Sequence, residues 1–166
     1  MPSIAVFGIS IVLSFMAWGL VTAHFIWPAL RDRSRVDALR PLLILHTFRF
    51  IGLSFLITGV VSPVLPATFA FDAAYGDLAA TILALLSLAV LRTGIGIPLV
   101  WIFNIWGTFD LLNAFYHGNA GALQPGQLGA AFFIPTAIVP FALITHGLMF
   151  WILLRSSAHN RAPAAA

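Results

Sequence analysis

Ionisable side chains lie inside segments of this chain that are otherwise apolar. His46 and Arg49 occur in the run LLILHTFRFIGLSFLI, residues 42–57, in which twelve of the sixteen residues are apolar or glycine. An arginine at the centre of a membrane helix costs about 3 kcal/mol on insertion scales, so it needs partners, water or a ligand. Arg49 is therefore interpreted either as a structural group bonded to neighbouring helices or as the anchor of a small polar or anionic ligand.

Depth along the helices predicts one polar layer. With a rise of about 1.5 Å per residue, five polar residues from four segments fall roughly 9 to 14 Å from one membrane face. The candidate ligand-binding residues are these five and Trp101, which shares a helix face with Asn104: His24, His46, Arg49, Trp101, Asn104 and His146. We expect at least two of the three imidazoles to point into the bundle within about 10 Å of each other. The alternative is separate hydrogen bonds between helices.

A second polar group is predicted nearer the opposite face. Asp110, Asn113 and His117 follow one another at intervals of three and four residues, along one stripe of a helix. They form either a secondary site or the hydrated end of that helix. Asp77 is interpreted as structural, because it falls near the positive end of a helix predicted to begin after Asp72.

The elements that position these residues are membrane-spanning helices. The chain has 166 residues, 61% hydrophobic and only 8% charged, whereas soluble domains carry about a quarter charged residues. A helix needs about 20 mostly apolar residues to cross a bilayer. The sequence predicts an all-α integral membrane protein, a five-helix bundle in one domain over residues 1–155, with a polar, Ala-rich tail over 156–166. The predicted spans are residues 4–30, 39–62, 73–91, 95–115 and 128–154.

The arginines predict the orientation. Seven of the eight basic residues, all of them arginines, flank the predicted spans on the same side: Arg31, Arg33, Arg35, Arg40, Arg92, Arg155 and Arg161. The positive-inside rule makes this side cytoplasmic, so the N-terminus is expected outside and the C-terminus inside. We predict a multi-pass protein of a bacterial inner membrane. Pro135 and Pro140 are expected to free carbonyl groups in the last span, which then need other partners.

Composition excludes several kinds of chemistry. The chain has no cysteine, which excludes disulfides and iron–sulfur clusters, and no lysine, which excludes a Schiff base. The serines have no spacing to histidine and aspartate that would indicate a hydrolase, so the sequence leans against an enzyme. The basic balance does not indicate nucleic acid, because the arginines flank apolar spans and form no soluble patch.

Three functional hypotheses remain. The first is a protein that binds or transports a small polar or anionic molecule, with proton coupling through the histidines. The second is a redox protein that holds a b-type haem or a quinone, with two of His24, His46 and His146 as haem or metal ligands. The third is a structural or assembly subunit of a larger membrane complex. The expected partners are the lipid bilayer, a small-molecule ligand, and either further copies of the chain or other membrane subunits.

One resemblance bears on the second hypothesis. The run RFIGLSFLITG, followed by Asp77 and LLSLAVLRTG, loosely resembles the pattern of DoxX-like small membrane proteins over less than half of the chain. The resemblance does not assign the family. The resemblance slightly favours the redox hypothesis.

Overall fold

The fold is an elongated bundle of helices. It was obtained as a computed structural model, which describes residues 3–120 and 123–155, without the side chains of residues 119 and 120. These residues form six α-helices, which are α1 Ser3–Val21, α2 Trp27–Leu30, α3 Arg35–His46, α4 Ala67–Val90, α5 Gly96–Ala120 and α6 Val139–Leu154. Four further segments are 3₁₀ or π-helical. The π-helical segments are η1 Thr22–Ile26 and η4 Ile134–Ile138, and the 3₁₀ segments are η2 Thr47–Leu56 and η3 Pro125–Phe132.

Four continuous helical stretches are long and apolar enough to cross a membrane. They are Ser3–Leu30, Arg35–Leu56, Ala67–Val90 and Ile134–Leu154. The prediction of an all-α protein with several apolar helices is therefore confirmed, and these helices suggest a multi-pass membrane protein. The fourth predicted span, residues 95–115, corresponds to α5, which has 25 residues but a more polar composition. The predicted tail, including Arg161, lies outside the described residues.

Two predicted boundaries were wrong. The third span was expected to begin at Ala73 with Asp72 as its cap, but α4 begins at Ala67, directly after Pro66. A proline suits the start of a helix, so the helix gains almost two turns and Asp72 lies within it. The second span was expected to reach Ser62 but ends at Leu56, because its last ten residues form the 3₁₀ segment η2. A 3₁₀ helix rises about 2.0 Å per residue, so fewer residues cover the same depth.

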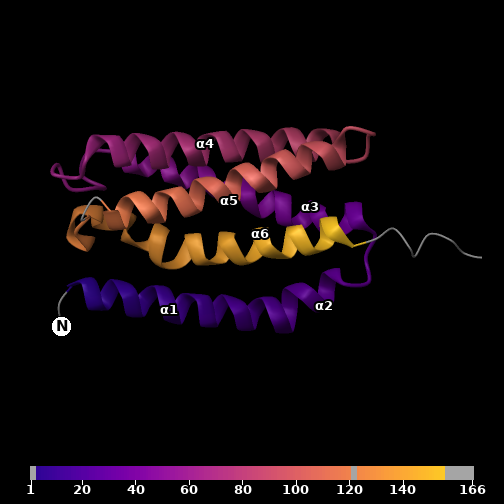
Figure 1. The fold of residues 1–166 in the computed structure, drawn as a ribbon, viewed down its shortest axis with the longest axis horizontal. Coiled ribbons are helices and arrows are strands. Elements are labelled where there is room, and N and C mark those ends of the chain that lie inside the picture. Colours follow the sequence, from indigo (N-terminus) through magenta and orange to yellow (C-terminus); the bar gives the residue numbers. More distant parts are fainter. Residues whose placement is uncertain (1–2, 121–122, 156–166) are drawn as a thin grey trace, which may run out of the picture.

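The helices are arranged around α6 and α5. In Figure 1, α1 lies along one side of the bundle, α6 separates it from α4, and α5 crosses obliquely between α4 and α6. No residue of α1 is buried, and this helix contacts mainly α6, η4 and η3. Its contacts include a ring pair between Trp18 and Phe141, whose centroids lie 4.4 Å apart. The helix α1 is therefore a peripheral wall and not a core element.

The irregular π-helical segment before α6 forms a hydrogen bond with a side chain of α1. The π-helical segment η4 contains Pro135, and Pro140 follows in the first turn of α6. The indole Nε1 of Trp18 donates a hydrogen bond to the carbonyl oxygen of Ala137 at 3.0 Å. This contact agrees with the expectation that carbonyls near these prolines bond outside their own helix.

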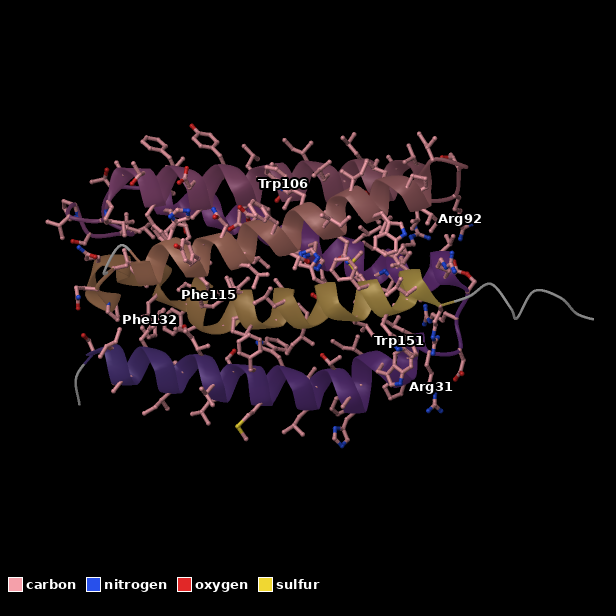
Figure 2. All side chains as sticks on the ribbon, viewed as in Figure 1. Arg31, Arg92, Trp106, Phe115, Phe132 and Trp151 are labelled. Atoms are coloured by element: carbon pink, nitrogen blue, oxygen red, sulfur yellow. The ribbon has the colours of Figure 1, made fainter. Side chains whose placement is uncertain are left out.

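Arginines gather at one end of the bundle. Figure 2 shows Arg31 and Arg92 at the same end, close to the last described residue of α6. Arg155 NH1 donates to the Arg31 carbonyl at 2.9 Å, and Arg92 pairs with Asp37 at 3.3 Å. The Arg155 guanidinium also lies 3.7 Å from the centre of the Trp151 ring. These arginines thus share one end, as the sequence indicates, and the side of the membrane that this end faces stays a prediction.

Candidate functional site

Arg49 is the centre of a buried charge cluster. Its side chain on η2 is buried, with only 5% of the residue exposed. Its Nε donates to Asp77 Oδ1 at 2.6 Å, and NH2 donates to Asp110 Oδ2 at 2.5 Å. Its NH1 donates to the carbonyl oxygen of Gly107 at 3.2 Å. Every nitrogen of the guanidinium is therefore used, and one side chain links η2, α4 and α5.

Glycines provide the space for both carboxylates. A Cβ atom added to Gly52 would lie 2.0 Å from Asp77 Oδ2, and one added to Gly76 would lie 1.7 Å from Asp110 Oδ1. Real Cβ atoms do not approach other atoms so closely, so each carboxylate occupies the space that a side chain would take. The absence of a Cβ at Gly52 and Gly76 is thus what lets α4 and α5 bring their aspartates to Arg49.

A third glycine brings the charge cluster against a histidine. A Cβ atom added to Gly107 would lie 2.6 Å from His146 Nε2 and 2.9 Å from Arg49 NH1. The two side chains therefore meet at the same point on the surface of α5. No hydrogen bond joins them, and the buried Nε2 of His146 has no hydrogen-bond partner among the described residues.

The two buried histidines form a polar layer beside the charge cluster. The rings of His46 and His146 contact each other, with centroids 4.1 Å apart. His146 Nδ1 faces Asn104 Oδ1 at 2.7 Å, while Asn104 Nδ2 donates to the His146 carbonyl at 3.3 Å. Because the amide oxygen is an acceptor, His146 carries its proton on Nδ1, and Nε2 is left with a free lone pair. Thr145 Oγ1 bonds to His46 Nε2 at 3.1 Å.

The predicted layer is partly assembled. His46, Arg49, Asn104 and His146 lie together, which meets the expectation of two imidazoles within about 10 Å. His24 does not join them, because its exposed ring bonds through Nδ1 to the carbonyl of Leu20 on its own helix at 2.9 Å. A π-helical segment places His24 on the outer face of the bundle, whereas straight depth counting ignores the direction of a side chain.

The other predicted residues are dispersed. Trp101 is half-buried and packs against Phe150, with ring centroids 5.8 Å apart. His117 is exposed beside Tyr116 and is not in the charge cluster. Asn113 lines a surface groove together with Asp110. Of the predicted outer group, only Asp110 reaches Arg49.

Asp77 was missed by the sequence analysis. Its predicted place near a helix start was wrong, because α4 begins ten residues before it, and its carboxylate pairs with Arg49. A count of charges would have found it. Asp77 and Asp110 are the aspartates that lie well inside the predicted spans, and a buried arginine needs anionic partners.

A cavity of about 470 Å³ opens onto the two carboxylates. Its walls come mainly from α1, α4, α5, η3 and η4, with one residue each from η2 and α6, and they are mostly apolar and aromatic. Phe115, labelled in Figure 2, is one of its wall residues, and Phe69 is another. Asp77 and Asp110 supply the carboxylates of the lining. The arrangement is an apolar chamber with an acidic end.

The histidine pair does not fit a haem as it stands. Two imidazoles that ligate one haem iron lie on opposite faces of the macrocycle, which must fit between them. The rings of His46 and His146 are in direct contact, and Phe103 packs against both, with centroids 5.2 and 5.3 Å away. Within the described residues, no group of three or more His, Asp or Glu side chains is arranged to hold a metal ion.

Comparison with known proteins identifies a family. Residues 6–154 match the family model described as "Domain of unknown function (DUF8737)", which covers most of the chain. The chain therefore belongs to this family. No curated protein and no solved structure matches it.

Proposed function

We propose that this member of the DUF8737 family binds a small amphiphilic molecule in the cavity between α1, α4 and α5. The apolar body of the ligand lies against the aromatic walls, and a cationic or hydrogen-bond-donating head faces Asp77 and Asp110. The observation that carries the proposal is the cavity of about 470 Å³ with two carboxylates at one end. Ligand sites commonly have this form, with volumes of about 300–1,000 Å³ and a few polar groups among apolar walls.

The charges of the cluster favour a cation over an anion. Arg49 supplies one positive charge, and Asp77 and Asp110 supply two negative charges when ionised, so 1 − 2 gives a formal excess of −1. The guanidinium already donates to both carboxylates and to a carbonyl, so an anionic ligand would have to compete with two anions for the same cation. A buried excess charge is costly without compensation, so the empty site holds a proton and a cationic ligand replaces it.

This exchange makes binding proton-coupled. Asp110 is the better candidate for carrying the proton, because it lines the cavity and is more exposed than Arg49, with 12% of its side chain accessible. His146 Nε2 lies next to Arg49 at the other side of the cluster and is a free acceptor. A second cation beside Arg49 is unfavourable, so a proton that leaves the carboxylates is expected to pass through the cavity to the solvent.

The membrane arrangement that we propose has five spans. The helix α5 has 25 residues and a length of about 37 Å, enough to cross the hydrocarbon core beside the four more apolar stretches. Its polar residues face the charge cluster and the groove. With the arginine-rich end in the cytoplasm of a bacterial cell, the N-terminus is periplasmic and the cavity lies in the outer half of the bundle.

A ligand panel tests the proposal. The full chain is purified in a non-ionic detergent and its melting temperature is measured with hexyltrimethylammonium, hexanol, hexanoate and a short-chain quinone. We expect the cation to stabilise the protein most and hexanoate least. A larger shift with hexanoate contradicts the charge argument, and a larger shift with the quinone favours the redox hypothesis instead.

A cavity-filling variant locates the binding. Ala114 lines the cavity, so Ala114→Trp fills part of it and should abolish the stabilisation by the cation. Ala89 lies on the exposed face of α4, and Ala89→Trp is the matched control that should bind normally. Equal binding by both variants places the ligand elsewhere. If no probe binds the wild type, the protein is better explained as a structural subunit.

Proton release tests the coupling. In weakly buffered solution with a pH indicator dye, the cation should release up to about one proton per chain, as the charge count implies. Asp110→Asn removes the exchangeable site and should suppress the release, whereas Asp32→Asn at the far end should not. Binding without any release by the wild type separates a simple binding protein from a proton-coupled one.

A further inference from the structure

A second hollow lies on the outer surface of α4 and α5. It has a volume of about 400 Å³ and contains no residue of α1 or α6, so it opens on a different side from the cavity described above. We call it the aromatic groove. Its ring-bearing residues are Phe71, Tyr75, Trp106 and Phe109. Trp106 is labelled in Figure 2, near the line where α4 and α5 meet.

The polar groups of the aromatic groove are acidic or neutral. Asp72, Asp110 and Asn113 line it, and no basic residue does. Asp110 is paired with Arg49, but the carboxylate of Asp72 has no ion pair or hydrogen bond with any described residue. Asp72 lies in the second turn of α4, so it is close to the end of the bundle opposite the arginines. An unpaired negative charge therefore lies beside a set of aromatic rings.

The aromatic rings of the groove are exposed, and two of them lie nearly parallel. Trp106 is 43% exposed, and the rings of Phe71 and Tyr75 are nearly parallel, with an angle of 8° and centroids 6.1 Å apart. Aromatic faces carry partial negative charge and attract cations, and Trp is the most effective of them. A carboxylate next to such faces adds a full negative charge, which attracts a cation more strongly.

We propose that the aromatic groove binds an organic ammonium group, against the faces of Trp106 and Tyr75 and next to the carboxylate of Asp72. A metal ion fits less well, because the oxygen atoms do not converge into a group of three. An anion is disfavoured because every charged residue of the lining is acidic. The groove shares Asp110 with the cavity but opens on another face of the bundle, and it does not require that the cavity binds a ligand.

Such a group has two sources, a soluble ammonium compound or the headgroup of a lipid. The groove begins about 8 Å from the start of α4, counted to Asp72, which is a depth that a lipid headgroup reaches. Both sources present the same charged nitrogen with alkyl carbons around it. The experiment below separates them by changing the lipid while keeping the soluble probe.

The test uses tryptophan emission of the full chain in a non-ionic detergent. Tetraethylammonium chloride is added, with sodium chloride at the same ionic strength as the reference. We expect a saturable change in emission that disappears in Trp106→Phe. Asp72→Asn should weaken the apparent affinity by about fivefold, the size expected for one nearby charge in water-like surroundings. Asp32→Asn removes one negative charge at the far end and should leave the affinity unchanged.

Several results would overturn the proposal. An unchanged emission at saturating probe, or an equal effect of Asp72→Asn and Asp32→Asn, shows that the groove does not bind ammonium. A wild type that is dimeric, and that becomes monomeric in Phe109→Ser, assigns the groove to a second copy of the chain. Ile11→Phe narrows the cavity from α1, which contributes no residue to the groove, and should leave this binding intact, so failure of the cavity and failure of the groove are distinguishable.

Lipid nanodiscs then identify the source. In nanodiscs of phosphatidylglycerol alone, the soluble probe should bind as in detergent. If the groove takes lipid headgroups, adding phosphatidylethanolamine should weaken the probe severalfold in the wild type and not in Asp72→Asn. An unchanged probe affinity leaves soluble ammonium compounds as the ligand class.

Discussion

The two halves of the bundle differ in how completely they are packed. Near the arginine-rich end, α3, α4, α5 and α6 enclose a cluster in which large side chains have no exposed surface, among them Leu39, Leu43, Phe103 and Met149. Toward the other end, the buried cluster contains many alanines, such as Ala70, Ala74 and Ala131, and borders the cavity. The charge cluster of Arg49 lies at the boundary between the halves.

Helices such as α4 run through both halves, so the difference in packing comes from the segments that lie against them. On the packed side, α4 presents Ala80 and Ala84 to the large side chains of α3 and α5, which fill the space. On the open side, α3 is continued by the 3₁₀ segment η2, and one wall of the cavity comes from α1, which has no buried residue. Apolar contact alone gives little drive for helix association in lipid. The Arg49 contacts therefore fix the alignment where packing stops.

The largest effect is expected from Arg49→Ala. It removes three hydrogen bonds and leaves Asp77 and Asp110 close together without a cation. Breaking a buried ion pair by removing one partner costs about 3–5 kcal/mol. We expect a large loss of thermal stability in detergent, with the packed half surviving longer than the open half in hydrogen exchange.

A compensated variant separates charge from packing. Arg49→Leu combined with Asp77→Asn and Asp110→Asn removes all three charges at once, and it should regain much of the lost stability. A triple variant that is as unstable as Arg49→Ala would mean that the shape of the arginine, and not its charge, holds the two halves together.

Phenylalanine truncations compare the two halves directly. Phe103 has no exposed surface and packs on both buried histidines, so Phe103→Ala should cost about 3 kcal/mol. Phe69 is partly buried and already borders the cavity, so Phe69→Ala loses fewer contacts and should cost less than half as much. Melting temperatures of the two variants give the answer, and equal losses would remove the distinction between the halves.

The boundary itself is sensitive to a single methyl group. Gly76→Ala places a Cβ where Asp110 Oδ1 lies, so the carboxylate must move away from Arg49 or α4 must shift. Overpacking of this kind costs about 1–3 kcal/mol, and it should also weaken ligand binding in the cavity. Gly147→Ala in α6 is the control, because nothing lies within 4 Å of its added Cβ and alanine favours a helix. A Gly76→Ala variant as stable as the control would show that Asp110 moves freely.

Much of the fold follows from the sequence because apolar length is a strong signal. Residues 4–30 and the greater part of 128–154, from Ile134 onward, needed no tertiary information to be identified as helices. The change from α to 3₁₀ geometry at Thr47 was not predictable, because it depends on how Arg49 and Gly52 dock on α4. Helix type inside one apolar run has little signature in hydropathy.

The sequence predicted which residues lie in the site better than it predicted which of them contact each other. Depth counting brought His46, Asn104 and His146 together, because neighbouring spans share the same depth scale. It placed Arg49 and Asp110 too far apart, because helix tilt and the reach of an arginine are not visible in residue numbers. The direction of His24 was lost for the same reason, since rotation about a helix axis changes at a π turn.

The smallest expected effect concerns the hydrogen bond that closes the histidine layer. Thr145 Oγ1 bonds to His46 Nε2 at 3.1 Å and also to the carbonyl oxygens of Phe141 and Ala142 on its own helix. Thr145→Val keeps the shape and removes only the hydroxyl. Hydrogen bonds between membrane helices average about 0.6 kcal/mol, so the loss should be near this value.

Thr108→Val is the matched control for this bond. The Thr108 hydroxyl donates only to the carbonyl of Asn104 in its own helix, so its removal should leave stability almost unchanged. The difference between the two variants, measured by unfolding in mixed detergent, isolates the contribution of the contact with His46. A loss of several kcal/mol in Thr145→Val would mean that the histidine layer, and not Arg49, holds the packed half against the open half. No difference between the variants would mean that His46 finds another hydrogen-bond partner when the hydroxyl is removed.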